Sequence, residues 1–288
     1  MFTLNLSKKL LWILGLVVSA LIIAHLATQV LKYHYGYYTQ LGLERLVNLD
    51  GENNIPSWYA SSALLLCSGV LAFIGSLQRR HSQPDAGYWV ILAAIFLYLS
   101  IDEAASIHET VIQGILWRLW PTLDTRGSLH YPWVLAGAVF VVFVGLILLR
   151  FLIRLPPRTR WGFVVSGVVF VSGALGVEVL EANHDVRYGQ QTFGFAMFVA
   201  VEEGMEMIGV LIFLHTLLAY IATYLSDTPV LLRIVGFAAP RPRDPAAEQR
   251  SNLGLPHSPI RALSTYPDLA EPAEQPSNAR SGAVSRSK

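Results

Sequence analysis

Apolar residues dominate six long stretches of the chain, and short polar stretches separate them. Each stretch has roughly the 20 apolar residues that an α-helix needs to cross the hydrocarbon core of a bilayer. The pattern therefore predicts an all-α integral membrane protein with six transmembrane helices. The expected helices cover about residues 10–31, 58–77, 88–116, 133–153, 161–183 and 193–220.

Basic residues flank these stretches unevenly, and their distribution predicts the orientation. Lys8 and Lys9 precede the first stretch, and further arginines follow the second and surround the connection between the fourth and the fifth. Because an excess of Lys and Arg marks the cytoplasmic side, we expect both termini in the cytoplasm. The first stretch is longer than the core of a typical signal peptide, which favours an uncleaved helix. The predicted location is a bacterial-type inner membrane.

The composition changes after the sixth stretch and predicts three regions. Residues 1–225 form the six-helix transmembrane domain, and residues 226–239 form a juxtamembrane amphipathic segment. Residues 240–288 are rich in Pro, Ser, Ala and Arg and have no hydrophobic periodicity. Such a segment cannot bury enough apolar surface to fold, so we expect a disordered cytoplasmic tail that could recruit a cytoplasmic partner.

The composition also excludes several classes of function. Only 14% of the residues are charged, against about 25% in soluble domains, and the mean hydropathy is +0.45. The net charge of +1 gives no reason to expect binding to nucleic acid. The chain has no Gly-rich phosphate loop, so no nucleotide cofactor is expected, and Cys67 is its only cysteine, which excludes a Cys-rich metal site.

Ionisable residues interrupt the third apolar stretch within Ser100–Glu109. A charge near the centre of a bilayer costs at least ~2.5–3.5 kcal/mol, so such residues usually face the protein interior or a water-filled cavity. Two later stretches carry similar clusters. The three clusters are Asp102, Glu103, His108 and Glu109; Glu178, Glu181, His184 and Asp185; and Glu202, Glu203 and Glu206.

Helical geometry predicts that these clusters form one site. An α-helix turns about 100° per residue, so a continuous third helix would place Asp102 and Glu109 on one face, with His108 and Glu103 on opposite flanks. The alternating direction of the helices places all three clusters at a similar depth. We therefore expect one polar site on the third, fifth and sixth helices, opening to the outer side.

The number of carboxylates in these clusters indicates metal binding. They cannot all stay ionised in a low dielectric without compensation, and the arginines of the chain lie outside the stretches that carry them. Oxygen-rich ligation with one or two imidazoles predicts one or two divalent metals, either iron, manganese or zinc. The expected metal ligands are Asp102, Glu109, Glu178, Glu181, His184, Glu203 and Glu206, and the expected catalytic proton handlers are His108 and Glu202.

Two short motifs resemble known families. Glu181–His184, with the sequence Glu-Ala-Asn-His, resembles half of the paired Glu-x-x-His pattern of ferritin-like di-iron proteins. The second copy is missing, because Glu203 is followed by Glu206. The pair Glu202 and Glu203 is similar to the Glu-Glu pair of intramembrane CAAX-type proteases, although Met207 stands where that family has an Arg. Neither match assigns the chain to a family.

Several interpretations stay open at this point. The pattern favours a metal-dependent membrane enzyme, a hydrolase or an oxidoreductase, acting on a lipid or another apolar substrate. The alternative is a proton- or cation-coupled transporter using the same carboxylates, although the sequence shows neither an inverted repeat nor an interrupted helix. A sensor, an assembly factor and a purely structural polar network are further readings.

Individual residues also have a second interpretation. Glu103 can be a peripheral acid of the site. His184 and Asp185 can simply mark the end of the fifth helix. His25, in the first apolar stretch, can either pack against other helices or belong to the site.

Overall fold

The structure is a computed structural model that describes residues 2–38, 40–120, 127 and 130–225. This part of the chain is helical and has no strand. Six helices are long and apolar enough to cross a membrane, which confirms the prediction of six spans. The predicted juxtamembrane segment at 226–239 and the predicted tail at 240–288 lie outside the described residues.

The membrane-spanning helices are longer than the apolar stretches that predicted them. They are α1 (Phe2–Tyr35), α3 (Ile55–Arg80), α4 (Ala86–Ala105), α6 (Trp133–Arg154), the continuous run of α7 (Pro157–Val171), η4 (Ser172–Val177) and α8 (Glu178–Tyr188), and α9 (Phe193–Tyr224). The shorter elements are η1 (Gln40–Gly42), α2 (Leu43–Val47), η2 (Ile107–Ile112) and α5 (Gln113–Leu119).

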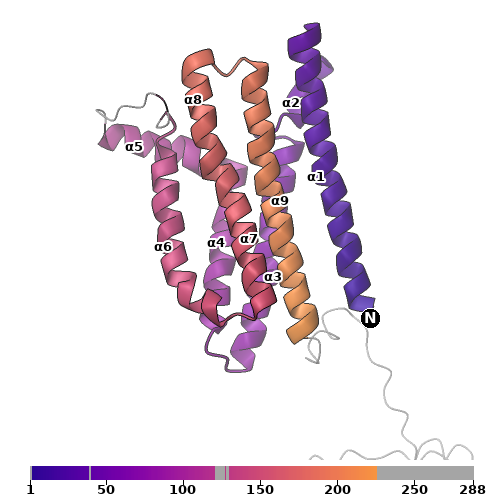
Figure 1. Cartoon of the computed structure of the whole chain (residues 1–288), viewed down its shortest axis with the longest axis vertical. Helices are drawn as coiled ribbons and strands as arrows, with labels where there is room; N and C mark the ends of the chain where they lie inside the picture. Colours follow the sequence, from indigo (N-terminus) through magenta and orange to yellow (C-terminus); the bar gives the residue numbers. More distant parts are fainter. Residues whose placement is uncertain (1, 39, 121–126, 128–129, 226–288) are drawn as a thin grey trace, which may run out of the picture. The chain divides into compact units, whose positions relative to one another are not determined.

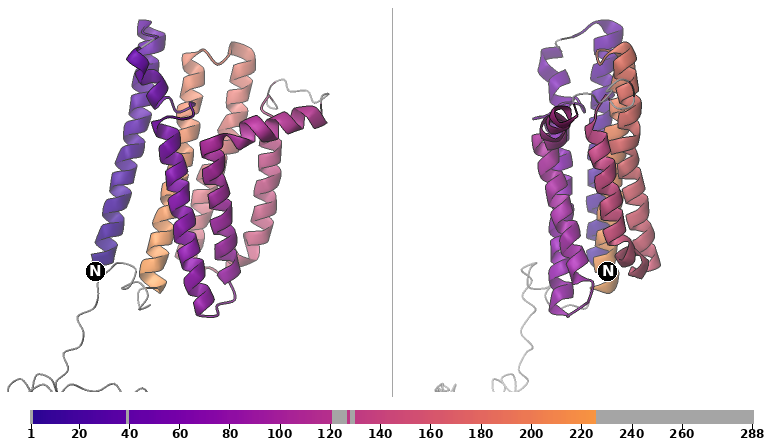
Figure 2. Two further views of the ribbon diagram at one scale, coloured as in Figure 1. Left: turned by 180° about the vertical axis from the view of Figure 1, so that it is seen from behind. Right: turned by 90° about the vertical axis from the view of Figure 1, so that its left-hand side faces the viewer.

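The long helices lie side by side, and α9 contacts most of the others (Figures 1 and 2). It packs against α1, α3 and α7, while α4 packs along α3. The connections that follow α1 and α4, together with the short α8–α9 connection, lie at the upper end of Figure 1. This end, which we call the cavity end, is where the polar residues of the three clusters lie.

Small residues let α7, η4 and α9 approach closely. A Cβ atom built on Gly209 would lie 2.9 Å from the backbone nitrogen of Phe170, and one on Gly173 would lie 2.8 Å from the carbonyl oxygen of Glu202. Gly162 makes room for the side chain of Thr216. Close backbone approach at small residues is the usual means of packing transmembrane helices.

The prediction of one continuous third helix over 88–116 is wrong. The helix α4 ends at Ala105, and Ser106 adopts a left-handed conformation with φ 48° and ψ 46°. The chain then forms η2, a π-helix, and α5, which runs across the bundle instead of along it (Figure 2). The break has a side-chain cause, because Asp102 Oδ1 accepts the backbone N–H of His108 at 2.9 Å and replaces a helical partner.

The fifth span is also irregular, since η4 is a π-helix between α7 and α8. Single π-helical turns are rare and are frequent at functional sites. The sequence also predicted that no helix is interrupted, and the break in the third span at Ser106 shows that this prediction is wrong. Both irregular segments lie beside the ionisable clusters, η2 directly after Ser106 and η4 directly before Glu178.

We expect Gly173→Ala to lower the free energy of unfolding by about 1–3 kcal/mol, because the added methyl group overpacks the contact with α9. Gly176→Ala is the matched control in the same π-helix, since a Cβ there meets nothing within 4 Å. Denaturant-induced unfolding in detergent measures both changes. Equal stabilities of the two variants would contradict the close contact.

Candidate functional site

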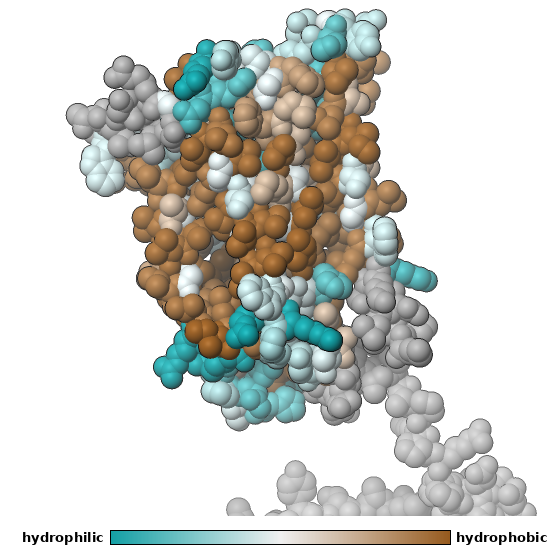
Figure 3. Space-filling model, viewed as in Figure 1, coloured by the Kyte–Doolittle hydropathy of each residue, from teal (hydrophilic) through white to brown (hydrophobic). Residues whose placement is uncertain are grey.

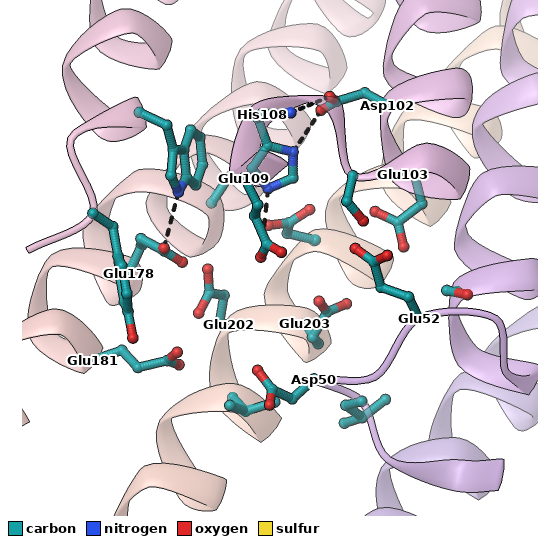
Figure 4. Close-up of a pocket in the computed structure, with 18 of the residues that line it drawn as sticks. Asp50, Glu52, Asp102, Glu103, His108, Glu109, Glu178, Glu181, Glu202 and Glu203 are labelled. Atoms are coloured by element: carbon teal, nitrogen blue, oxygen red, sulfur yellow. Dashed lines mark hydrogen bonds and ion pairs between the residues drawn. The ribbon is translucent and has the colours of Figure 1, made fainter. Parts of the chain in front are cut away.

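Carboxylate side chains line one cavity at the cavity end of the bundle (Figure 4). Its volume is about 420 Å³. Its walls come from α3, α4, η2, α5, α6, α7, η4, α8, α9 and the connection between α2 and α3. The acidic residues that line it are Asp50, Glu52, Asp102, Glu103, Glu109, Glu178, Glu181, Glu202, Glu203 and Glu206. The structure therefore brings acidic residues from all three sequence clusters to one cavity.

The charged side chains that line this cavity are almost all acidic. Among the described residues that line it there is no lysine or arginine, and His108 is the one imidazole. Ionised carboxylates so close together repel each other, and burial makes each charge more costly. The cavity can therefore hold either protons or cations, and its donors are almost all oxygen atoms.

His108 is oriented by Asp102. The Nδ1 atom of His108 lies 2.8 Å from Asp102 Oδ2, and the same carboxylate accepts the backbone N–H of His108. A carboxylate at Nδ1 favours the tautomer with the proton on that atom and leaves Nε2 as an acceptor. Nε2 lies 3.9 Å from Glu109 Oε1, so this atom faces the carboxylates of the cavity.

The pKa of His108 results from opposing effects. Burial by itself lowers it, but the hydrogen bond to Asp102 and the charges of Asp102, Glu109 and Glu178 together raise it above the ordinary value. A histidine with a raised pKa is a stronger base. Its second nitrogen can therefore accept a proton or bind a metal.

Trp133 connects His108 to the carboxylates of α8. The centroid of its ring lies 4.4 Å from that of His108, and its Nε1–H donates to Glu178 Oε1 at 3.1 Å. Both contacts come from the first residue of α6. The start of α6 thus fixes the distance between the imidazole and Glu178.

Glu178, Glu181 and Glu202 form the tightest group of donors. Each offers one carboxylate oxygen, and the three oxygens lie within 4.8 Å of one another. Glu181 is 5% exposed, and its Oε2 atom is buried without a hydrogen-bond partner. A buried carboxylate oxygen left unpaired is costly, so the three side chains need either shared protons or a cation that they bind together.

A second group of acids forms the floor of the cavity. Glu103, Glu203 and Glu206 line both the cavity and a small space beneath it that Tyr59, Met207 and other apolar residues enclose. The structure thus places Glu103 in the site, where the sequence left it open as a peripheral acid.

The structure does not bring His184 to the cavity. Its Nε2 lies 2.8 Å from the hydroxyl of Thr192, which caps the start of α9, and its ring packs on Tyr188 and Phe198. Asp185 likewise accepts a hydrogen bond from Tyr131 at 2.7 Å. His184 secures the start of α9, and Asp185 ties α8 to the segment before α6. These contacts agree with the helix-end interpretation and not with metal ligation.

Asp50 and Glu52 also line the cavity, although their sequence pattern did not predict them as site residues. They lie in the connection between α2 and α3, where the only signal was a polar stretch between two apolar ones. Burial, followed by the charges of Glu109 and Glu178, raises the pKa of Asp50 to about 7. This carboxyl group therefore changes its charge near neutral pH.

His25 holds this connection in place. It is fully buried, its Nδ1 accepts the backbone N–H of Leu49 at 3.1 Å, and its Nε2 lies 3.2 Å from the carbonyl oxygen of Ala196. These contacts fit a neutral imidazole that donates from Nε2 to α9. His25 does not line the cavity, and its hydrogen bond to Leu49 anchors the residue that precedes Asp50.

Comparisons with known proteins identify a family without a described function. Residues 10–221 match the family model described as Domain of unknown function (DUF8692). The chain has no significant match among curated proteins or among solved structures. Because the match covers all six membrane-spanning helices except the first and last turns of the bundle, the chain belongs to the DUF8692 family.

Proposed function

We propose that the chain is a metal-dependent membrane hydrolase that acts on a lipid or another amphiphilic substrate. The observation that carries the proposal is the unpartnered, buried Oε2 of Glu181 between Glu178 and Glu202, beside an imidazole oriented by Asp102. A divalent cation would give that oxygen a partner and would offset the negative charge of the cavity.

The donor set favours a hard cation. Glu178, Glu181 and Glu202 would hold it, and the surrounding acids add further oxygen donors. Of the metals expected from the sequence, manganese fits a carboxylate-rich site best, because iron and zinc sites more often include several imidazoles. When bound, the cation supplies positive charge that polarises a water molecule or a substrate carbonyl or phosphoryl oxygen.

The protein residues divide the remaining work. His108 Nε2 accepts the proton of the attacking water, and Asp102 stabilises the imidazolium that results. Trp133 keeps the imidazole beside Glu178. The floor acids Glu103, Glu203 and Glu206 can return a proton to the leaving group.

Hydrolysis is favoured over oxygen chemistry at a ferritin-like di-iron centre. That pattern needs one Glu-x-x-His motif on each of two helices. This chain has one such motif, and its His184 contacts the hydroxyl of Thr192 instead of the cavity. A three-carboxylate cluster beside an Asp-oriented histidine is instead suited to activating water.

The test is cation binding followed by activity. Purified wild-type protein should bind Mn²⁺ at one site per chain, measured by electron paramagnetic resonance of free Mn²⁺ in a titration. Hydrolysis of long-chain esters and phosphoesters should be lost after chelation and return with Mn²⁺. Protein that binds no divalent cation, or hydrolysis that chelation leaves unchanged, would refute the proposal.

Cation affinity should rise with pH because of Asp50. Its carboxyl group is protonated and uncharged below about pH 7 and negatively charged above it. Between about pH 6 and about pH 8 its ionised fraction rises about tenfold, and the affinity for Mn²⁺ should rise with it. Titrations of wild type and Asp50→Asn at both pH values measure the effect, and the variant should lose part of the dependence. An identical pH dependence in Asp50→Asn would contradict the role of this residue.

The corrected helices also support a second function, a cation- or proton-coupled transporter. Helices that are broken beside an ion site are a common feature of transporters, and α4 breaks at Ser106 beside the cavity. Metal- or pH-driven flux into proteoliposomes, abolished in Glu203→Gln, would favour this function. Hydrolysis without flux would favour the enzyme.

A further inference from the structure

A second cavity, of about 500 Å³, lies between α4, α6, α7 and α9. We call it the apolar groove. Its walls are aliphatic and aromatic side chains, and the described residues that line it include no charged side chain. The hydroxyls of Ser166 and Ser172 are its polar groups, and that of Ser166 already donates to the carbonyl oxygen of Phe163.

The groove exists because α6 is held at its two ends. At one end Trp133 bonds to Glu178, and at the other end Phe151 packs against Trp89 and Phe163. Between these contacts α6 stands away from α7, and Figure 3 shows a hollow in the apolar surface between the two helices. A hollow in this position is accessible sideways from the hydrocarbon of a membrane.

The apolar groove adjoins the carboxylate cavity. Leu64, Leu99 and Phe170 line both spaces. Phe170 and Leu64 also border the small space under the floor acids Glu203 and Glu206. A chain lying in the groove would therefore end beside the floor of the cavity.

Two glycines leave the groove open where a larger residue would fill it. Gly145 of α6 and Gly167 of α7 both line the groove, and a Cβ atom built on either meets nothing within 4 Å. These glycines are not needed for helix packing, unlike Gly173 and Gly209. Their effect is to keep the groove wide.

We infer that the apolar groove binds the hydrocarbon chain of the amphiphile whose head is processed in the carboxylate cavity. This inference rests on the proposed function and names its substrate class, a long-chain lipid with a head that carries no net negative charge. Apolar surface in the groove contributes about 25 cal/mol for each Å² that the chain covers. The carboxylates and the absence of lysine and arginine among the described lining residues disfavour an anionic head.

The test is photolabelling of the full-length protein in lipid nanodiscs. The probe is a long-chain alcohol with a diazirine in the middle of the chain and a terminal alkyne. In wild type it should label peptides of α6 and α7, and excess unmodified alcohol should compete. Gly145→Leu and Gly167→Leu should each reduce labelling about tenfold, because each leucine displaces about two methylene groups of the chain.

Gly69→Leu is the matched control. Gly69 lies on α3 outside the groove, and a Cβ there also meets nothing within 4 Å. The probe should label α6 and α7 of the Gly69→Leu variant to the same extent as in wild type. Equal labelling of all three variants would show ordinary contact with membrane lipid and would overturn the inference. A long-chain sulfate probe that labels as well as the alcohol would overturn the assignment of the head.

Failure of this inference can be distinguished from failure of the proposed function. Glu181→Gln should weaken cation binding and keep labelling in the groove. If wild-type protein binds Mn²⁺ but shows no labelling in the groove, only the proposed site for the hydrocarbon chain is refuted. Groove labelling in a protein that binds no cation refutes the hydrolase and leaves the lipid site.

Discussion

Glu181→Gln is expected to weaken Mn²⁺ binding by about 10–100-fold or more. Losing even a residue that only supports a ligand costs about that factor in metal affinity. The amide keeps the shape of the side chain but removes the charge and one acceptor from the group that includes Glu178 and Glu202. Titration of the purified variant with Mn²⁺ measures the change.

Glu44→Gln is the control for this result. It also removes one carboxylate near the cavity end, but Glu44 pairs with Lys32 at 2.9 Å and does not line the cavity. Its affinity for Mn²⁺ should stay close to that of wild type. Equal losses in the two variants would mean that general charge, and not a defined site, attracts the cation.

His108→Ala is expected to lower the turnover number of the long-chain substrate by about 10²–10⁴-fold, which is the usual contribution of a general base. Asp102→Asn should have an effect of similar direction, because an amide at this position no longer favours the tautomer with the proton on Nδ1. Steady-state kinetics should be measured with each variant loaded with as much cation as wild type. A lower turnover number then reflects the loss of the base and not weaker cation binding.

The pH profile separates a base from a structural role. Activity should fall as the pH drops through the pKa of His108, and Asp102 raises that pKa. In Asp102→Asn the acidic limb should therefore move to lower pH. His215→Ala is the control, since His215 is exposed on α9 and lies outside the cavity lining. An unmoved acidic limb would indicate that His108 is not the base.

The site could be predicted from the sequence only in part. Charged residues inside apolar stretches are rare, so Glu178, Glu181, Glu202, Glu203 and Glu206 stand out in the chain itself. Asp50 and Glu52 do not stand out in the sequence, because acidic residues are common in polar connections. His184 appeared to be a ligand from its spacing to Glu181, and only its contact with Thr192 shows otherwise.

The helical angles predicted for Ser100–Glu109 failed for a related reason. They assumed that the backbone stays regular, but the carboxylate of Asp102 takes the N–H of His108 and the helix ends. After the left-handed Ser106, Glu109 lies on η2, so its direction no longer follows from that of Asp102. The two residues still line the same cavity, by a path that spacing does not describe.

By itself the sequence determined that the chain is helical, has six segments able to cross a membrane and carries acids within three of them. Hydrophobicity and helical length are local properties, and they can be read residue by residue. Only the tertiary structure decided which acids meet, that Asp102 orients His108, that His25 holds the connection carrying Asp50, and that an apolar groove opens beside the cavity. These features depend on hydrogen bonds and packing between side chains and backbone groups that the fold brings together. The local pattern of apolar and polar residues does not specify these contacts.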